Sequence, residues 1–157
     1  MDHPITQAVR FLREKDVAFV PHLYDYVEKG GAAESARALG VDLHAVIKTL
    51  VFETNEKRPL IVLMHGNREV STKNLARHLG VKSVEPVTPE RASKLTGYLV
   101  GGTSPFGSRT PMTVYVEKTI FDLDKIYING GKRGFLVQIE SGVVKRVLPV
   151  EEIEVGI

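Results

Sequence analysis

The chain has 157 residues, an ordinary size for one folded domain with its own hydrophobic core. Hydrophobic residues make up 43% of it and charged residues 25%, which excludes disordered and fibrous proteins. The formal net charge is only +2, so the chain lacks the cationic excess of proteins that bind nucleic acid through many phosphates. Contact with a single RNA end is still compatible with this charge.

Cysteine is absent, which excludes disulfides, thiolate metal sites and a cysteine nucleophile supplied by the protein. The first 20 residues carry several charged side chains and have no apolar signal core. No stretch reaches the roughly 20 apolar residues that cross a bilayer. We therefore expect a cytoplasmic protein with no membrane association, folded as one domain over residues 1–157.

The first half of the chain predicts three helices and three strands. An apolar stripe from Ile5 to Leu12 has helical spacing, and residues 17–24 form an extended run that Pro21 confines to a sheet edge. Further helices are expected over residues 32–39, ended by Gly40, and from Ser71 or Thr72 to Leu79; Asp42 caps an extra turn. Two apolar runs joined by a polar turn predict a hairpin of Ile47–Glu53 and Leu60–Met64.

In the second half, Thr88-Pro89-Glu90 predicts a helix start, because a capping residue precedes a proline and an acid. A loop follows over 98–107, and then strands over 113–117, 125–128 and 135–140. Several strand pairs have links too short for parallel crossovers. We predict an α+β (mixed α/β) fold, in which helices surround a mixed sheet.

Lys48 lies on a strand where its side chain shares one face with Leu50 and Phe52. An ammonium among apolar neighbours costs several kcal/mol by rough estimate, unless it meets an anion or opens onto a cleft. Two interpretations are open: a lysine whose stem reaches water, which the spacing alone favours, and a functional lysine.

Two glycine-containing segments are further candidates. In the loop Val100–Gly107, paired glycines and a proline would let backbone N–H groups approach a ligand carbonyl or phosphate, although an ordinary turn has the same composition. Asn129–Gly134 predicts a hairpin turn with two cations at its tip, or a turn that contacts phosphate. The five histidines show no metal-binding spacing, so no metal is expected.

Taken together, four segments resemble the YbaK/EbsC family: Tyr24, Val46–Leu50, Thr96–Gly107 and Ile128–Gly134. Members are trans-editing deacylases of mischarged tRNA. The chain most resembles the YbaK type, which clears cysteine from tRNA(Pro), and a related insertion domain of prolyl-tRNA synthetases clears alanine. The resemblance implies a mixed, barrel-like β-sheet surrounded by helices, and no cofactor.

The resemblance also implies roles for individual residues. Lys48 would favour the developing oxyanion, together with the backbone of Gly101 and Gly102, and the thiol of the substrate would attack its own ester carbonyl. The substrate would be bound by Tyr24, Thr49, Thr103, Ser104, Pro105, Asn129, Gly130 and Gly131. Leu136 stands where some relatives carry an acid, and residues 27–31 lack an aromatic, so the amino acid removed stays open.

The predicted function is deacylation of mischarged tRNA, with Cys-tRNA(Pro) as the expected substrate. One alternative is an Ala-tRNA(Pro) deacylase. A second, from another class, is a non-catalytic module that binds aminoacyl ends or prolyl-tRNA synthetase. Because the net charge is small, we expect tRNA selectivity to come from association with prolyl-tRNA synthetase.

Overall fold

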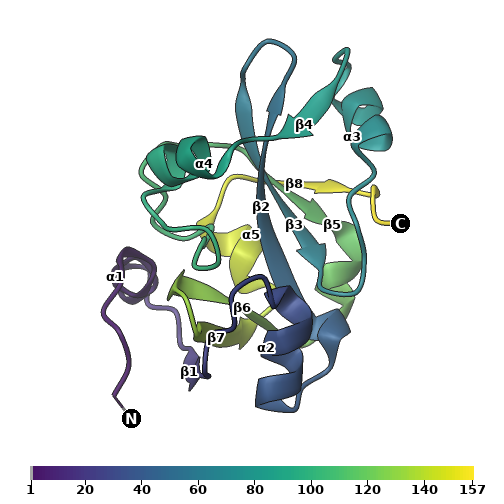
Figure 1. The fold of residues 1–157 in the computed structure, drawn as a ribbon. Helices are drawn as coiled ribbons and strands as arrows, with labels where there is room; N and C mark the ends of the chain where they lie inside the picture. Colours follow the sequence, from purple (N-terminus) through teal and green to yellow (C-terminus); the bar gives the residue numbers. More distant parts are fainter. Residues whose placement is uncertain (1) are drawn as a thin grey trace.

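The computed structural model describes residues 2–157, in which eight strands form one mixed sheet (Figure 1). The strand order is β1, β7, β6, β2, β3, β5 and β8, and β4 pairs with the end of β2. The elements in chain order are α1 (Gln7–Glu14), β1 (Val20–Leu23), α2 (Gly31–Leu39), the 3₁₀ helix η1 (Leu43–Ala45), β2 (Val46–Thr54), β3 (Pro59–His65), α3 (Thr72–Leu79), β4 (Val84–Pro86), α4 (Pro89–Thr96), β5 (Val114–Glu117), the 3₁₀ helix η2 (Lys118–Asp122), β6 (Lys125–Lys132), β7 (Phe135–Glu140), α5 (Val143–Val147) and β8 (Val150–Ile153).

The pairing confirms the predicted mixed sheet. β2 and β3 form the expected antiparallel hairpin, whereas β2 with β6, β3 with β5, and β5 with β8 are parallel. The sheet does not close into a barrel, because β1 and β8 end the strand order. Pro21 lies in the edge strand β1, where its missing N–H removes no central ladder bond.

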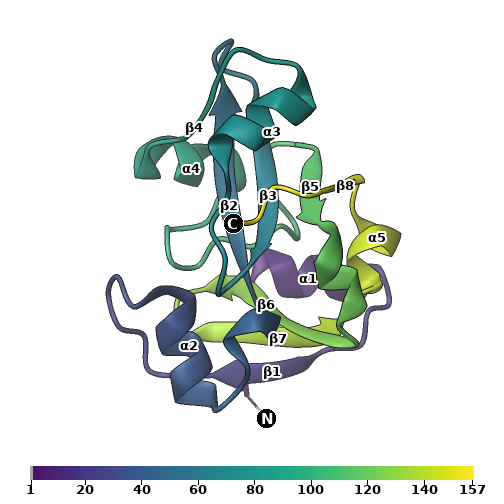
Figure 2. The ribbon, with the colours of Figure 1, turned by 90° about the vertical axis from the view of Figure 1, so that its right-hand side faces the viewer.

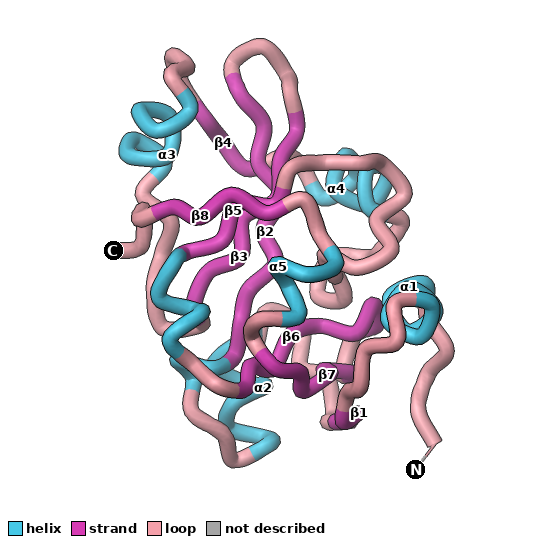
Figure 3. The backbone as a smooth tube through the Cα atoms, turned by 180° about the vertical axis from the view of Figure 1, so that it is seen from behind, coloured by secondary structure: helices cyan, strands magenta, loops and turns pink. Residues whose placement is uncertain are grey.

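The two faces of the sheet are covered differently. Odd-numbered residues of β2 and β3, such as Ile47 and Leu63, join the large core to which α1, α4 and α5 contribute. Even-numbered residues face two smaller clusters, one beneath α3 and one beneath α2. In Figure 2 α3 and α2 lie at opposite ends of the β2–β3 hairpin, and in Figure 3 α1 lies beside β6 and β7.

The second edge of β2 is only partly paired. β6 pairs with Val46 and Ile47, and β4 pairs with residues 52–54, so no strand within residues 2–157 pairs with this edge of β2 between residues 48 and 51. Because the sheet opens at this point, side chains from both faces of β2 reach a common space. The gap therefore places the functional candidate Lys48 at an opening in the sheet.

Local signals predicted most element ends. The Thr88 side chain accepts the N–H of Arg91 at 3.2 Å, and Pro89 begins α4. Gly40 ends α2 with left-handed backbone, φ 66°. The prediction of a turn over 129–134 was too long, since β6 continues through a bulge to Lys132. No helix within residues 2–157 is both long and apolar enough to cross a membrane.

Candidate functional site

A cleft of about 890 Å³ lies at the gap in β2. This volume is within the usual range for small-molecule sites. Its walls come from β2, the loop before α2, the segment before α3, the start of α4 and the loop after α4. The lining residues are Tyr24, Tyr26, Val27, Glu28, Lys29, Gly31, Ala32, Glu34, Ser35, Val46–Phe52, Glu69, Val70, Thr72, Pro86, Val87, Pro89, Ala92, Val100, Gly101, Thr103, Asn129, Arg133 and Leu136.

Lys48 enters this cleft from the face of β2 that it shares with Leu50. Its side chain is 18% exposed, so most of its stem is covered, while the hydrogen bonds of its ammonium lie at the surface. Its Nζ donates to the main-chain carbonyl of Arg68 and lies 3.4 Å from Oε1 of Glu69, an exposed carboxylate. The ammonium is thus fixed on one side and borders the cleft, where it can meet an anionic or developing negative group.

Thr49 lies next to Lys48 and also lines the cleft. Its Oγ1 is buried and has no hydrogen-bond partner among residues 2–157. Nearby, the Ser35 hydroxyl donates to the phenol oxygen of Tyr24 at 2.9 Å, and Leu136 adds an apolar wall. The cleft therefore combines an apolar wall with a buried hydroxyl that has no hydrogen-bond partner among the described residues.

The first part of the loop Val100–Gly107 forms a tight turn at the cleft. Gly102 N–H donates to the Leu99 carbonyl at 2.8 Å, and Gly101 has φ 94°, a backbone region that favours glycine. A Cβ at Gly101 would lie 2.5 Å from the Tyr26 phenol oxygen, so a larger residue would collide there. The turn thus requires glycine both for its backbone and for its close approach to Tyr26.

The bulged end of β6 and the residue after it brace this turn. Asn129 Nδ2 donates to the Gly101 carbonyl at 3.0 Å, and Arg133 Nε donates to the Val100 carbonyl at 2.8 Å. The Arg133 guanidinium also stacks over the Tyr26 ring at 5.1 Å. With both carbonyls held from outside the turn, its backbone is oriented before any ligand binds.

The predicted site residues fall into two groups. Those that line the cleft are Tyr24, Lys48, Thr49, Gly101, Thr103 and Asn129. The others do not line it. The Ser104 hydroxyl is buried and accepts the Phe106 N–H at 3.2 Å, and Pro105 is also buried. Gly102 packs on the backbone of residues 132–133, Gly130 on the Phe135 ring and Gly131 on Thr6 and Tyr98.

Among the other lining residues, three that contact the predicted ones were not predicted as site residues from the sequence. Tyr26 and Arg133 come from segments that the fold brings together, and Glu69 lies in an irregular stretch before α3. The alternation of Tyr24 and Tyr26 was a weak signal for Tyr26, because period-two spacing places two residues on one side of an extended chain. Nothing local marks Glu69 as a partner of Lys48.

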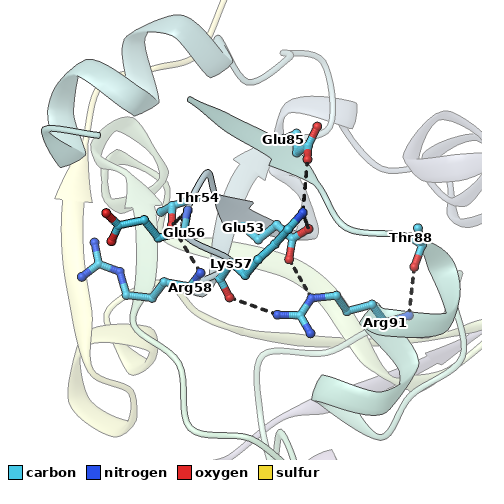
Figure 4. A network of polar contacts seen from close by, with 8 residues as sticks. All are labelled: Glu53, Thr54, Glu56, Lys57, Arg58, Glu85, Thr88 and Arg91. Atoms are coloured by element: carbon cyan, nitrogen blue, oxygen red, sulfur yellow. Dashed lines mark hydrogen bonds and ion pairs between the residues drawn. The ribbon is translucent and has the colours of Figure 1, made fainter. Parts of the chain in front are cut away.

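A partly buried ion pair fixes α4 beside the cleft (Figure 4). The Glu53 side chain is 9% exposed; it accepts Arg91 Nε at 2.7 Å and lies 3.3 Å from Lys57 Nζ. Arg91 also donates to the Lys57 carbonyl at 3.1 Å. Burial alone would raise the pKa of Glu53, but the bonds from Arg91 and Lys57 outweigh it and lower this pKa. The pair ties the hairpin to the helix that supplies Pro89 and Ala92 to the cleft.

Residues 28–146, which include most of the cleft, match the family of the aminoacyl-tRNA editing domain. The chain belongs to this family. The match confirms the family predicted from the four motifs, and with it the predicted class of aminoacyl-tRNA deacylase. Within residues 2–157 of this editing domain, no three or more His, Asp or Glu side chains are grouped as a metal site would require.

Curated relatives of the editing domain include both free-standing and multidomain proteins. The "Putative Cys-tRNA(Pro)/Cys-tRNA(Cys) deacylase EbsC" of Enterococcus faecalis is 30% identical over 135 residues, or 85% of this chain and 82% of that protein. The proline–tRNA ligase of Limosilactobacillus fermentum is 26% identical over 106 residues, or 65% of this chain. The matched segment is only 18% of the ligase.

A solved structure shares the fold of the editing domain. It is described as a "putative trans-editing enzyme for prolyl tRNA synthetase" and superposes with a TM-score of 0.82 at 21% identity. The match covers 98% of each chain. At this identity the similarity establishes the arrangement of the sheet and helices only.

Proposed function

We propose that this editing domain removes cysteine from mischarged Cys-tRNA(Pro). The observation that carries the proposal is the cleft at the gap in β2, which is lined by Lys48, Thr49 and the braced turn at Gly101. The relative EbsC, whose name describes a putative deacylase of cysteine-charged tRNA, aligns over 85% of this chain and supports cysteine as the amino acid removed.

In the proposed reaction the substrate supplies the nucleophile, since the protein has no cysteine. The thiol of the esterified cysteine attacks its own carbonyl carbon, a C–S bond forms, and the ester C–O bond to the ribose breaks. The thiol proton passes to the ribose oxygen, and water then opens the cyclic thioester. Lys48 would stabilise the oxyanion, while Gly101, Thr49 and Tyr24 would hold the aminoacyl group.

Selectivity for tRNA(Pro) is proposed to come from association with prolyl-tRNA synthetase. A net charge of +2 allows few phosphate contacts, so free tRNA would bind weakly at cellular salt. Proline–tRNA ligases that contain a related segment support this partnership. Co-purification of the two proteins, with and without tRNA, tests it; no complex under either condition would contradict it.

The deciding experiment is a deacylation panel of tRNA(Pro) charged with cysteine, alanine, serine or proline. We expect rapid release of cysteine and slow release of proline. Release of alanine in place of cysteine would assign the domain to alanine editing. If no ester is hydrolysed but charged tRNA still binds, the domain is a binding module and the catalytic proposal fails.

A further inference from the structure

The position of the Lys48 ammonium depends on a short irregular segment. Its Nζ bonds to the carbonyl of Arg68 and lies 3.4 Å from the Glu69 carboxylate. The Glu69 side chain is 82% exposed, so by itself it holds the lysine weakly. The main chain at residues 68–69 is therefore the firmer support for Lys48.

Residues 155–157 hold this segment in place. Glu69 and Ile157 exchange both backbone hydrogen bonds, at 3.0 and 2.9 Å, and Ser71 N–H donates to the Val155 carbonyl at 2.8 Å. Between these bonds, Val70 and Gly156 form an isolated antiparallel bridge. The support of Lys48 is thus paired with a segment more than 80 residues away along the chain.

Glu117, at the end of β5, fixes residues 155–157 in turn. Its Oε1 accepts the Val155 N–H at 2.7 Å and its Oε2 accepts the Gly156 N–H at 2.9 Å. The residue is 3% exposed, and a buried carboxylate is costly unless its oxygens are hydrogen-bonded. A Cβ at Gly156 would lie 2.5 Å from Oε2, so glycine allows the close approach.

We propose that Glu117 is a positioning residue for Lys48. Glu117 does not contact Lys48 and acts on it through residues 155–157 and then residues 68–69. The inference rests on the proposed role of Lys48 in deacylation. Three consecutive sets of hydrogen bonds connect the buried carboxylate to the ammonium, and each joins main chain that has no other regular pairing. A small displacement of a catalytic group can slow a reaction by up to about 100-fold, so loss of this support would act on the rate.

A double-mutant cycle tests the proposal. Glu117→Gln keeps the size of the side chain, but its amide NH₂ cannot accept one of the two N–H groups. We expect the single-turnover rate constant for hydrolysis of Cys-tRNA(Pro), per folded protein, to fall at least about fivefold. The protein concentration that gives the half-maximal rate should change less than about twofold. In a Lys48→Ala background Glu117→Gln should cause no further loss; equal losses in both backgrounds would overturn the proposal. Glu140→Gln, an exposed carboxylate paired only with Lys125, is the matched control and should change neither value.

A second variant and a measurement without activity complete the test. Gly156→Ala disturbs the same contact from the other side, and it replaces Glu117→Gln if that variant does not fold. In either variant, NMR should show faster hydrogen exchange at the Glu69 amide and a less ordered ε-methylene of Lys48. Unchanged exchange and order would refute the positioning role. If the parent protein hydrolyses no charged tRNA, the proposed function fails, and these NMR results still decide whether Glu117 orders Lys48.

Discussion

Replacing Thr49 with valine should make the protein more stable and less active. Thr49 Oγ1 is buried without a partner among residues 2–157, and a buried unsatisfied polar group costs about 1–3 kcal/mol. Valine has nearly the same shape and no hydroxyl, so Thr49→Val should recover about 1 kcal/mol. For a domain of this size such a gain raises the melting temperature by about 2–4 °C.

The same substitution should weaken deacylation, because the hydroxyl is proposed to bond to the aminoacyl group. Loss of one such bond, at about 1.4 kcal/mol, corresponds to about a tenfold lower kcat/KM. Thermal unfolding and deacylation of Cys-tRNA(Pro) by the same preparation measure the two effects. Thr54→Val is the matched control on β2: Thr54 Oγ1 accepts the N–H groups of Glu56 and Arg58, both at 3.3 Å, so its loss should destabilise the fold.

Two results would refute the reasoning about Thr49. If Thr49→Val unfolds at a lower temperature than the parent, the hydroxyl has a partner in solution. If it gains stability but keeps full kcat/KM, the hydroxyl is unsatisfied yet does not contact the reacting substrate.

Four further predictions concern charged or titratable groups. Lys48→Ala should lower turnover by at least about tenfold, or roughly 1.4 kcal/mol of barrier, while Lys125→Ala should not; retained turnover in the first variant would remove Lys48 from the mechanism. Arg91→Ala should lower the free energy of unfolding by about 1–3 kcal/mol in urea, because it leaves the buried Glu53 carboxylate without its shortest bond; an unchanged midpoint would contradict this. The pKa of Glu53 is lowered in the folded state. Its contribution to the free energy of unfolding is therefore complete when the pH is above its ordinary pKa of 4.5, and it is lost as the pH falls below that value. Burial lowers the pKa of His65 below 6.5, so the unfolded chain binds a proton first and stability should fall as the pH drops below 6.5; a His65→Gln variant with the same slope between pH 6.5 and 5 would refute that assignment.

Much of the fold could be predicted from short stretches of sequence. The cap at Thr88 and the proline after it mark the start of α4, Gly40 marks the end of α2, and two apolar runs joined by a polar turn predict the β2–β3 hairpin. These signals succeed because the interactions that produce them, caps and periodic burial, lie within about ten residues of each other. Lys48 was singled out for the same local reason, as a charge on an apolar strand face.

The sequence alone did not reveal how the site is assembled. The short strand β4 has too few residues for a periodic pattern, and it forms because β2 offers it an edge at residues 52–54. The cleft exists because β6 and β4 leave one edge of β2 without a partner strand at residues 48–51, and Tyr26, Arg133 and Glu69 line it from three distant segments. The sequence by itself therefore determined the family, the first four α-helices, the hairpin and Lys48 as a candidate. Only the tertiary structure decided what surrounds that lysine, because strand pairing and burial between distant segments leave no pattern within one local stretch.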